Sequence, residues 1–215
     1  MRQPMHHLLL SSLIITLTCT PANAEQPQVP PFTAKTLDQW REQSFSGATH
    51  YQLTEDETGL SLMAQSDSAA SGLYFQKPLA IGPDSILQWR WKIGNVYQNL
   101  DEHSKAGDDF PARLYVIVSD GPFFWQKRTL VYVWSSYQPI DSRWVNPFTE
   151  RAIMWAVASG AAQKNQWLTH RRNLYTDLQT AFGRRYEQIE AIAIMSDSDN
   201  SRQSATAWYG NISLK

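Results

Sequence analysis

Apolar residues occupy every second position over most of two segments of the chain, residues 86–93 and 112–120, and most of the positions between them are polar. A period of two is typical of β-strands that have one face in the core and the other turned away from it. The pattern therefore predicts two half-buried strands. The side chains expected in the core are Leu87, Trp89, Trp91, Ile93, Leu114, Val116 and Val118, and those expected on the opposite face are Arg90, Lys92, Arg113 and Tyr115.

Segments rich in β-branched and aromatic residues recur along most of the chain, separated by turn residues such as those at 82–84 and 120–122. Helical periodicity is confined to residues 167–182, where Gly183 would end the helix, and residues 36–43 are a candidate for a shorter one. This order favours an all-β fold, an antiparallel two-sheet sandwich of the jelly-roll type with one or two short helices, over alternating βαβ units. The further strands are expected over residues 72–76, 129–135, 152–159, 189–195 and 205–214.

The first 24 residues have the three parts of a secretory signal peptide. Arg2 precedes an apolar run over residues 8–19, and Ala22-Asn23-Ala24 has the spacing of small residues that signal peptidase recognises. The run is shorter than the roughly 20 residues that span a bilayer, so no stable membrane insertion is expected after cleavage. We expect a mature protein that begins at Glu25 and is periplasmic or secreted.

Composition narrows the function classes further. The chain has 19 Lys and Arg residues against 20 Asp and Glu, a formal charge of −1, so no global basic field is available to bind a nucleic acid. The single cysteine, Cys19, excludes an intramolecular disulfide and a multi-cysteine zinc site. Residues 25–31 are proline-rich and are expected to form an extended tether, and residues 32–215 form a single domain.

Three stretches of the mature chain carry a resemblance to a known family. They are Lys105-Ala106-Gly107-Asp108-Asp109 with the strand that follows it, Ser196-Asp197-Ser198-Asp199-Asn200, and Ala207-Trp208-Tyr209-Gly210-Asn211-Ile212. Together they resemble the DUF3047 family of exported bacterial proteins, a family of unknown function. The last stretch is also similar, more loosely, to the final strand of galactose-binding-like jelly rolls. That second resemblance implies a fold and not an activity.

The two acidic motifs are expected to meet at one sheet edge. Gly107-Asp108-Asp109 precedes the strand over 112–120, and Asp197-Ser198-Asp199-Asn200 follows the strand over 189–195, so antiparallel pairing would bring them together. Four converging carboxylates repel one another unless a cation intervenes. Either Ca²⁺ binds through oxygen ligands, or Lys105 and Arg113 neutralise the aspartates. We favour an ion-paired loop in which Arg113 bridges Asp108 or Asp109 and Asp197 caps a turn, because Asp and Asn are ordinary turn residues.

A basic face is expected if the strands over 86–93 and 112–120 belong to one sheet. Arg90 and Lys92 would then lie beside Arg113 and Tyr115, where arginine could grip the carboxylates or sulfates of an acidic polysaccharide and tyrosine could cover a sugar ring. The alternative is a solvated outer face whose charges keep the sheet soluble.

Catalysis has less support from the sequence. Adjacent Asp108 and Asp109 would project in opposite directions, so a glycosidase pair would need Asp108 with Asp197 or Asp199. A lyase with His103 or Tyr115 as the base has no support from spacing. The chain contains neither the His-x-x-x-His pattern of zinc hydrolases nor the Gly-x-Ser-x-Gly elbow of serine hydrolases.

We therefore predict a non-catalytic module that binds a glycan or another small molecule, with a carbohydrate-active hydrolase or lyase as the alternative. No residue is assigned a catalytic role, and calcium is the candidate cofactor. The candidate ligand-binding residues are Arg90, Lys92, Lys105, Asp108, Asp109, Arg113, Tyr115, Asp197, Asp199 and Asn200.

Overall fold

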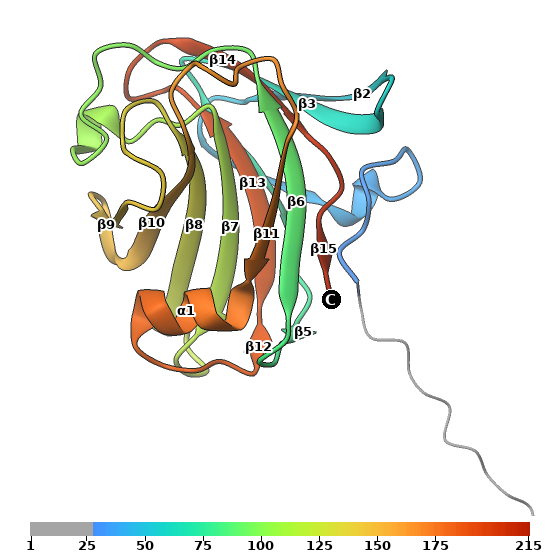
Figure 1. Ribbon diagram of the computed structural model, residues 1–215, viewed down its shortest axis with the longest axis vertical. Helices are drawn as coiled ribbons and strands as arrows, with labels where there is room; N and C mark the ends of the chain where they lie inside the picture. The colour runs from blue at the N-terminus through green and yellow to red at the C-terminus, as the bar shows by residue number, and fades with distance from the viewer. Residues whose placement is uncertain (1–27) are drawn as a thin grey trace, which may run out of the picture.

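A computed structural model describes residues 28–215 of the chain as a mostly β structure with three sheets (Figure 1). The largest sheet has the strand order β1 (Arg41–Ser46), β4 (Ala70–Phe75), β13 (Ala191–Asp197), β7 (Ala112–Ser119), β8 (Lys127–Ser135), β10 (Thr149–Ser159) and β9 (Arg143–Asn146). The second has the order β11 (Leu168–Asn173), β6 (Ile86–Ile93), β14 (Ser204–Tyr209), β3 (Gly59–Asp67) and β2 (His50–Asp56), and β15 (Ser213–Leu214) also pairs with β6.

The remaining elements are short. Strands β5 (Leu79–Ala80) and β12 (Gln188–Ile189) form the small third sheet, and α1 (Leu174–Phe182) is the one α-helix of residues 28–215. Three 3-10 helices complete the fold: η1 (Leu37–Gln39), η2 (Lys105–Gly107) and η3 (Phe124–Gln126). The prediction of an all-β fold with few helices is confirmed.

The pairing is antiparallel with one exception, so the prediction of purely antiparallel sheets is wrong at that place. Strands β8 and β10 run parallel, with Tyr132 opposite Trp155. After β8 the chain turns back into β9, and the β9–β10 hairpin then places β10 between β9 and β8. Because β9 has already reversed the chain direction, β10 runs the same way as β8.

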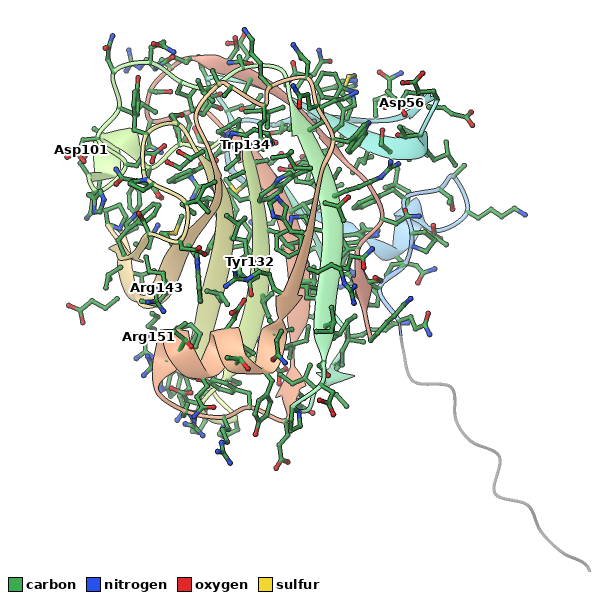
Figure 2. All side chains as sticks on the ribbon, in the orientation of Figure 1. Asp56, Asp101, Tyr132, Trp134, Arg143 and Arg151 are labelled. Carbon is green, nitrogen blue, oxygen red and sulfur yellow. The ribbon has the colours of Figure 1, made fainter. Side chains whose placement is uncertain are left out.

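The core lies between the two large sheets and is rich in tryptophan. Trp89 of β6 is 1% exposed, and its ring centroid lies 5.0 Å from that of Tyr132 on β8, in the other sheet. Trp91 and Trp134 make a second contact between the sheets, at 6.4 Å. Tyr132 and Trp134 lie among the side chains at the centre of the view in Figure 2. All seven residues that the alternation places in the core are buried.

The segment predicted as a helix over 167–182 is a strand followed by a helix. Residues 168–173 form β11 and extend the edge of the second sheet, with His170 opposite Trp89. Helix α1 begins only after Asn173, whose side chain accepts a hydrogen bond from the Thr176 amide at 2.9 Å. Gly183, at φ +71°, ends the helix as predicted. Pairing with β6 therefore overrides the local periodicity.

Two predictions concern the N-terminal third of the chain. In place of a helix over 36–43 the structure has η1 followed at Arg41 by β1. Of the predicted tether over 25–31, Val29 is only 7% exposed and joins the core, and the Trp40 indole donates to the Pro30 carbonyl at 3.3 Å. The end of this segment therefore packs on the domain.

The predicted signal peptide, residues 1–24, lies outside the described residues. Within residues 28–215, no helix is both long and apolar enough to cross a bilayer.

Candidate functional site

The two acidic motifs meet at one end of the largest sheet. Strands β7 and β13 pair antiparallel, with Arg113 opposite Met195, as the sequence predicts. The start of β7 therefore lies beside the end of β13. One carboxylate oxygen from each of Asp109, Asp197 and Asp199 lies within 4.8 Å of the others.

Arg113 bridges the two motifs. Its guanidinium donates to both carboxylate oxygens of Asp197, with the Nε–Oδ1 distance at 2.7 Å, and its Nη1 lies 3.5 Å from Oδ2 of Asp108. The same guanidinium donates to the Asp108 carbonyl and lies 4.6 Å from the centre of the Phe110 ring. Arg113 is 3% exposed and Asp197 2%. The predicted ion pair between Arg113 and Asp108 is present, but the predicted role of Asp197 as a turn cap is wrong, because Asp197 ends strand β13 and is the bidentate partner of Arg113.

Asp109 joins the loop after β13 to the loop before β7. Its carboxylate accepts hydrogen bonds from the side chain of Asn200 at 3.1 Å and from the backbone amide of Ser201 at 2.5 Å. Gly107 lets the chain fold tightly here, because a Cβ at this position would lie 2.2 Å from the carbonyl oxygen of Asp101. The Gly-Asp-Asp motif therefore holds together the two loops that form this end of the site.

Negative charge exceeds positive charge in this network. Burial and the neighbouring carboxylates raise the pKa of Asp197 to about 7, although Arg113 opposes the shift. Burial and Asp109 likewise raise the pKa of Asp199. Desolvation by burial is the main cause of both pKa shifts, and repulsion from the neighbouring carboxylates adds to it.

A cavity of about 570 Å³ lies beside this network, on the face of the largest sheet that points away from the core. Arg113, Tyr115 and Ile117 line the cavity, and they alternate along β7 with core residues such as Leu114 and Val116. Two exposed phenylalanines line it as well. Phe45 comes from β1 at one edge of the sheet and Phe148 from the β9–β10 turn at the other. The cavity therefore spans the sheet.

Polar groups line one end of the cavity. Asp108 accepts a hydrogen bond from the Asn146 side chain at 3.0 Å through Oδ2, and its Oδ1 is buried without a hydrogen-bond partner among residues 28–215. Asp199 and Asn200 line the same cavity. An unpaired buried acceptor carries a desolvation cost that a ligand donor would relieve.

Arg90 and Lys92 lie elsewhere, so the predicted shared basic face is wrong. They belong to β6 in the second sheet, whereas Arg113 and Tyr115 belong to β7 in the largest sheet. Arg90 lies 4.4 Å from the centre of the Trp167 ring, and Lys92 lies 4.6 Å from that of Trp208.

The partner of Lys92 confirms that these two surfaces are separate. The Lys92 ammonium is 3.3 Å from Asp56. In Figure 2, Asp56 lies across the molecule from Asp101, the residue that packs against Gly107 of the acidic motif. Alternation identifies the face of a strand that is buried, but it does not identify the sheet that the strand joins.

The structure brings together seven of the ten candidate site residues: Asp108, Asp109, Arg113, Tyr115, Asp197, Asp199 and Asn200. Lys105 lies at the rim, with its ammonium 5.4 Å from the centre of the Phe148 ring. Sequence reasoning did not identify Phe45, Tyr74, Asn146 and Phe148 as lining residues. No periodicity marks them, because each reaches the cavity from a different element.

Calcium has few free ligand atoms in this cluster. Both oxygens of Asp197 are bonded to Arg113, and Asp109 is bonded by the Asn200 and Ser201 donors. We expect thermal melting curves with calcium and with a chelator to coincide, both for the wild type and for Asp197→Asn. A rise in the melting temperature with calcium, reversed by the chelator, would contradict the ion-paired assignment, because a ligand bound only by the native state stabilises it.

Several solved structures were compared with this fold. The family 11 carbohydrate-binding module from Clostridium thermocellum, in complex with a β-1,3-1,4-mixed-linked tetrasaccharide, is 12% identical, with a TM-score of 0.44 over 87% of this chain and 93% of that one. A lectin from Bauhinia forficata in complex with GalNAc is 11% identical, with a TM-score of 0.36 over 88% of this chain and 96% of that one.

The glycoside hydrolase domain structure of Endo-D from Streptococcus pneumoniae R6 is 12% identical, with a TM-score of 0.40. That match covers 82% of this chain but only 21% of the Endo-D chain. No curated protein matches the sequence. A family model described as "Protein of unknown function (DUF3047)" matches residues 38–213, which is most of the chain. The protein therefore belongs to the DUF3047 family, as its acidic and C-terminal motifs predict.

Proposed function

We propose that this protein is an exported, non-catalytic glycan-binding module with a jelly-roll-like fold, and that the cavity on the outer face of the largest sheet is its binding site. The observation that carries the proposal is the combination of aromatic rings and buried polar groups in one cavity. Its volume, about 570 Å³, is in the range of small-molecule sites. Aromatic rings can cover the apolar faces of sugars while polar groups bind the hydroxyls.

The aromatic side chains differ in how they could meet a ligand. Phe45 is 69% exposed and Phe148 is 54% exposed, so both rings offer a face at the rim. Tyr74 and Tyr115 are half-buried deeper in the lining. We assign the rim rings to stacking and the tyrosines to the floor of the site.

The hydrolase alternative loses one of its two candidate carboxylate pairs, because Asp197 is bound on both oxygens by Arg113 and cannot face a scissile bond. The other pair, Asp108 with Asp199, lines the cavity, and a search for released sugars tests it. For the lyase alternative, burial raises the pKa of Tyr115 above its ordinary value, which makes this hydroxyl a poor base near neutral pH. The geometry therefore favours binding.

A glycan array followed by calorimetry with the strongest ligand tests the proposal. We expect Phe148→Ala to weaken binding roughly fivefold, because losing a stacked ring costs about 1 kcal/mol. The matched control is Phe123→Ala, since Phe123 is 52% exposed and does not line the cavity. Equal losses in the two variants, or no glycan bound by the wild type, would refute the proposal, and release of shorter sugars during the assay would favour the hydrolase.

A further inference from the structure

The charged side chains that line the cavity are predominantly acidic. They are Asp108, Asp197, Asp199 and Arg113, and the other lining residues are uncharged. With all four ionised, their formal charge is −2. Burial raises the pKa of Asp197 to about 7, so in mildly acidic buffer, with Asp197 protonated and Asp108 and Asp199 ionised, it is −1. Arg113 is not available to a ligand, because its guanidinium is bonded to Asp197 and Asp108 and is 3% exposed. A ligand in the cavity therefore meets carboxylates and no free guanidinium.

Asp108 and Asp199 have bonding capacity left for a ligand. Asp108 is only 6% exposed, and its Oδ1 has no hydrogen-bond partner within the described part of the chain. Asp199 is half-exposed, and its Oδ1 accepts a hydrogen bond from Asn200 at 3.2 Å. Among residues 28–215, no Lys, Arg or His forms an ion pair with Asp199. Both aspartates line the cavity.

The Lys105 ammonium at the rim of the cavity adds only a screened positive charge. The Lys105 side chain is exposed, and its ammonium lies over the Phe148 ring at the rim, where water and salt screen its field. Arg90 and Lys92, the other cations considered for an acidic ligand, lie on the second sheet. Among the lining side chains, the three aspartates therefore outnumber the single cation, Arg113.

A ligand with protonated amines suits this arrangement. An ammonium group carries three donors and a positive charge, so one amine of an oligomer can bond the free oxygen of Asp108 and another the carboxylate of Asp199. A uronate or a sulfate would instead add negative charge beside buried carboxylates, which is costly in a site of low dielectric constant. The arrangement therefore selects by charge as well as by shape.

We infer that the glycan bound in this cavity is an amino sugar polymer or oligomer with free, protonated amines, and not an acidic polysaccharide. This inference rests on the proposed function, and it replaces the acidic polysaccharide that the sequence offered as one of two readings of the basic face. The aromatic rim contributes sugar binding, and the Asp108 and Asp199 carboxylates select the amine.

Calorimetry with four oligosaccharides of equal length tests the inference: a β-1,4-linked glucosamine oligomer, its N-acetylated form, a glucose oligomer and a glucuronate oligomer. In a mildly acidic buffer of low ionic strength, we expect the glucosamine oligomer to bind roughly tenfold more tightly than the two neutral ones. We expect the glucuronate oligomer to bind most weakly. Added salt should reduce the differences.

The Asp199→Asn variant connects this preference to the cavity. We expect it to lose most of the preference for the glucosamine oligomer over the two neutral oligomers. Asp84→Asn is the control, because Asp84 is exposed and does not line the cavity, and it should keep the full preference. Melting curves for both variants establish that they are folded.

The outcomes separate the two proposals. If the neutral or glucuronate oligomers bind as tightly as the glucosamine oligomer, the inference about amines is wrong while glycan binding stands. If Asp84→Asn reduces the preference as much as Asp199→Asn does, the assignment to the cavity is wrong. If none of the four binds, or if a linear polyamine of equal charge binds as tightly as the glucosamine oligomer, glycan binding itself is contradicted.

Discussion

Arg113→Ala is expected to lower the free energy of unfolding by about 3–5 kcal/mol, because it leaves the buried carboxylates of Asp108 and Asp197 without their cation. The guanidinium is almost fully buried, so water cannot replace its hydrogen bonds. Urea unfolding followed by tryptophan fluorescence measures the loss. The m-value, which reports the surface exposed on unfolding, should stay constant.

Two further variants make this result specific. Arg113→Lys keeps the charge but cannot form two parallel bonds to Asp197, so it should be folded and should lose part of the same free energy. Arg128→Ala is the control, because Arg128 pairs with Asp120 with 35% of its side chain exposed and should cost under about 1 kcal/mol. A loss in Arg113→Ala no greater than that in Arg128→Ala would show that the buried network is not a major source of stability.

Trp89→Ala is expected to cost about 3–5 kcal/mol, the range for truncation of a large core side chain. The Trp89 ring lies 5.6 Å from that of Trp91 and 5.0 Å from those of Tyr132 and His170, so its removal opens a cavity where the two large sheets meet. Trp91→Ala should behave similarly, since Trp91 is fully buried. Chemical denaturation of each variant against the wild type measures the effect.

The neighbouring tryptophan on β14 supplies the control for this prediction. Trp208 is half-buried on the outer face of the second sheet, over Lys92, and Trp208→Ala should cost much less. Trp89→Phe should also cost less than Trp89→Ala, because it keeps a ring and removes an indole N–H that has no partner within residues 28–215. Equal losses for Trp89→Ala and Trp208→Ala would contradict the assignment of Trp89 to the core.

The sequence predicted the local features of the fold because they depend on neighbours in the chain. Alternation over 86–93 and 112–120 identified the buried face of both strands correctly, and every core residue that it named is buried. The same logic failed at 167–182, where a helical period coexists with a strand. There, the pairing of His170 with Trp89 decides the conformation, and it joins residues far apart in the chain.

The acidic network was predicted correctly in part. The sequence predicted that Gly107-Asp108-Asp109 and Asp197-Ser198-Asp199-Asn200 would meet, because both flank strands that are antiparallel neighbours. It also identified Arg113 as the cation that neutralises them. It did not show that this pairing would occupy Arg113 completely, since burial depends on Phe110, Asn146 and the rest of the surrounding packing.

By itself, the sequence determined the all-β class, the buried faces of the strands over 86–93 and 112–120, and the meeting of the two acidic motifs. Only the tertiary structure decided which sheet each strand joins, and so separated Arg90 and Lys92 from Arg113 and Tyr115. It also brought Phe45, Asn146 and Phe148 to one cavity from separate elements. The physical reason is that a period of two is set by the backbone of one strand, whereas a site is set by contacts such as that between Arg113 and Asp197, which are 84 residues apart.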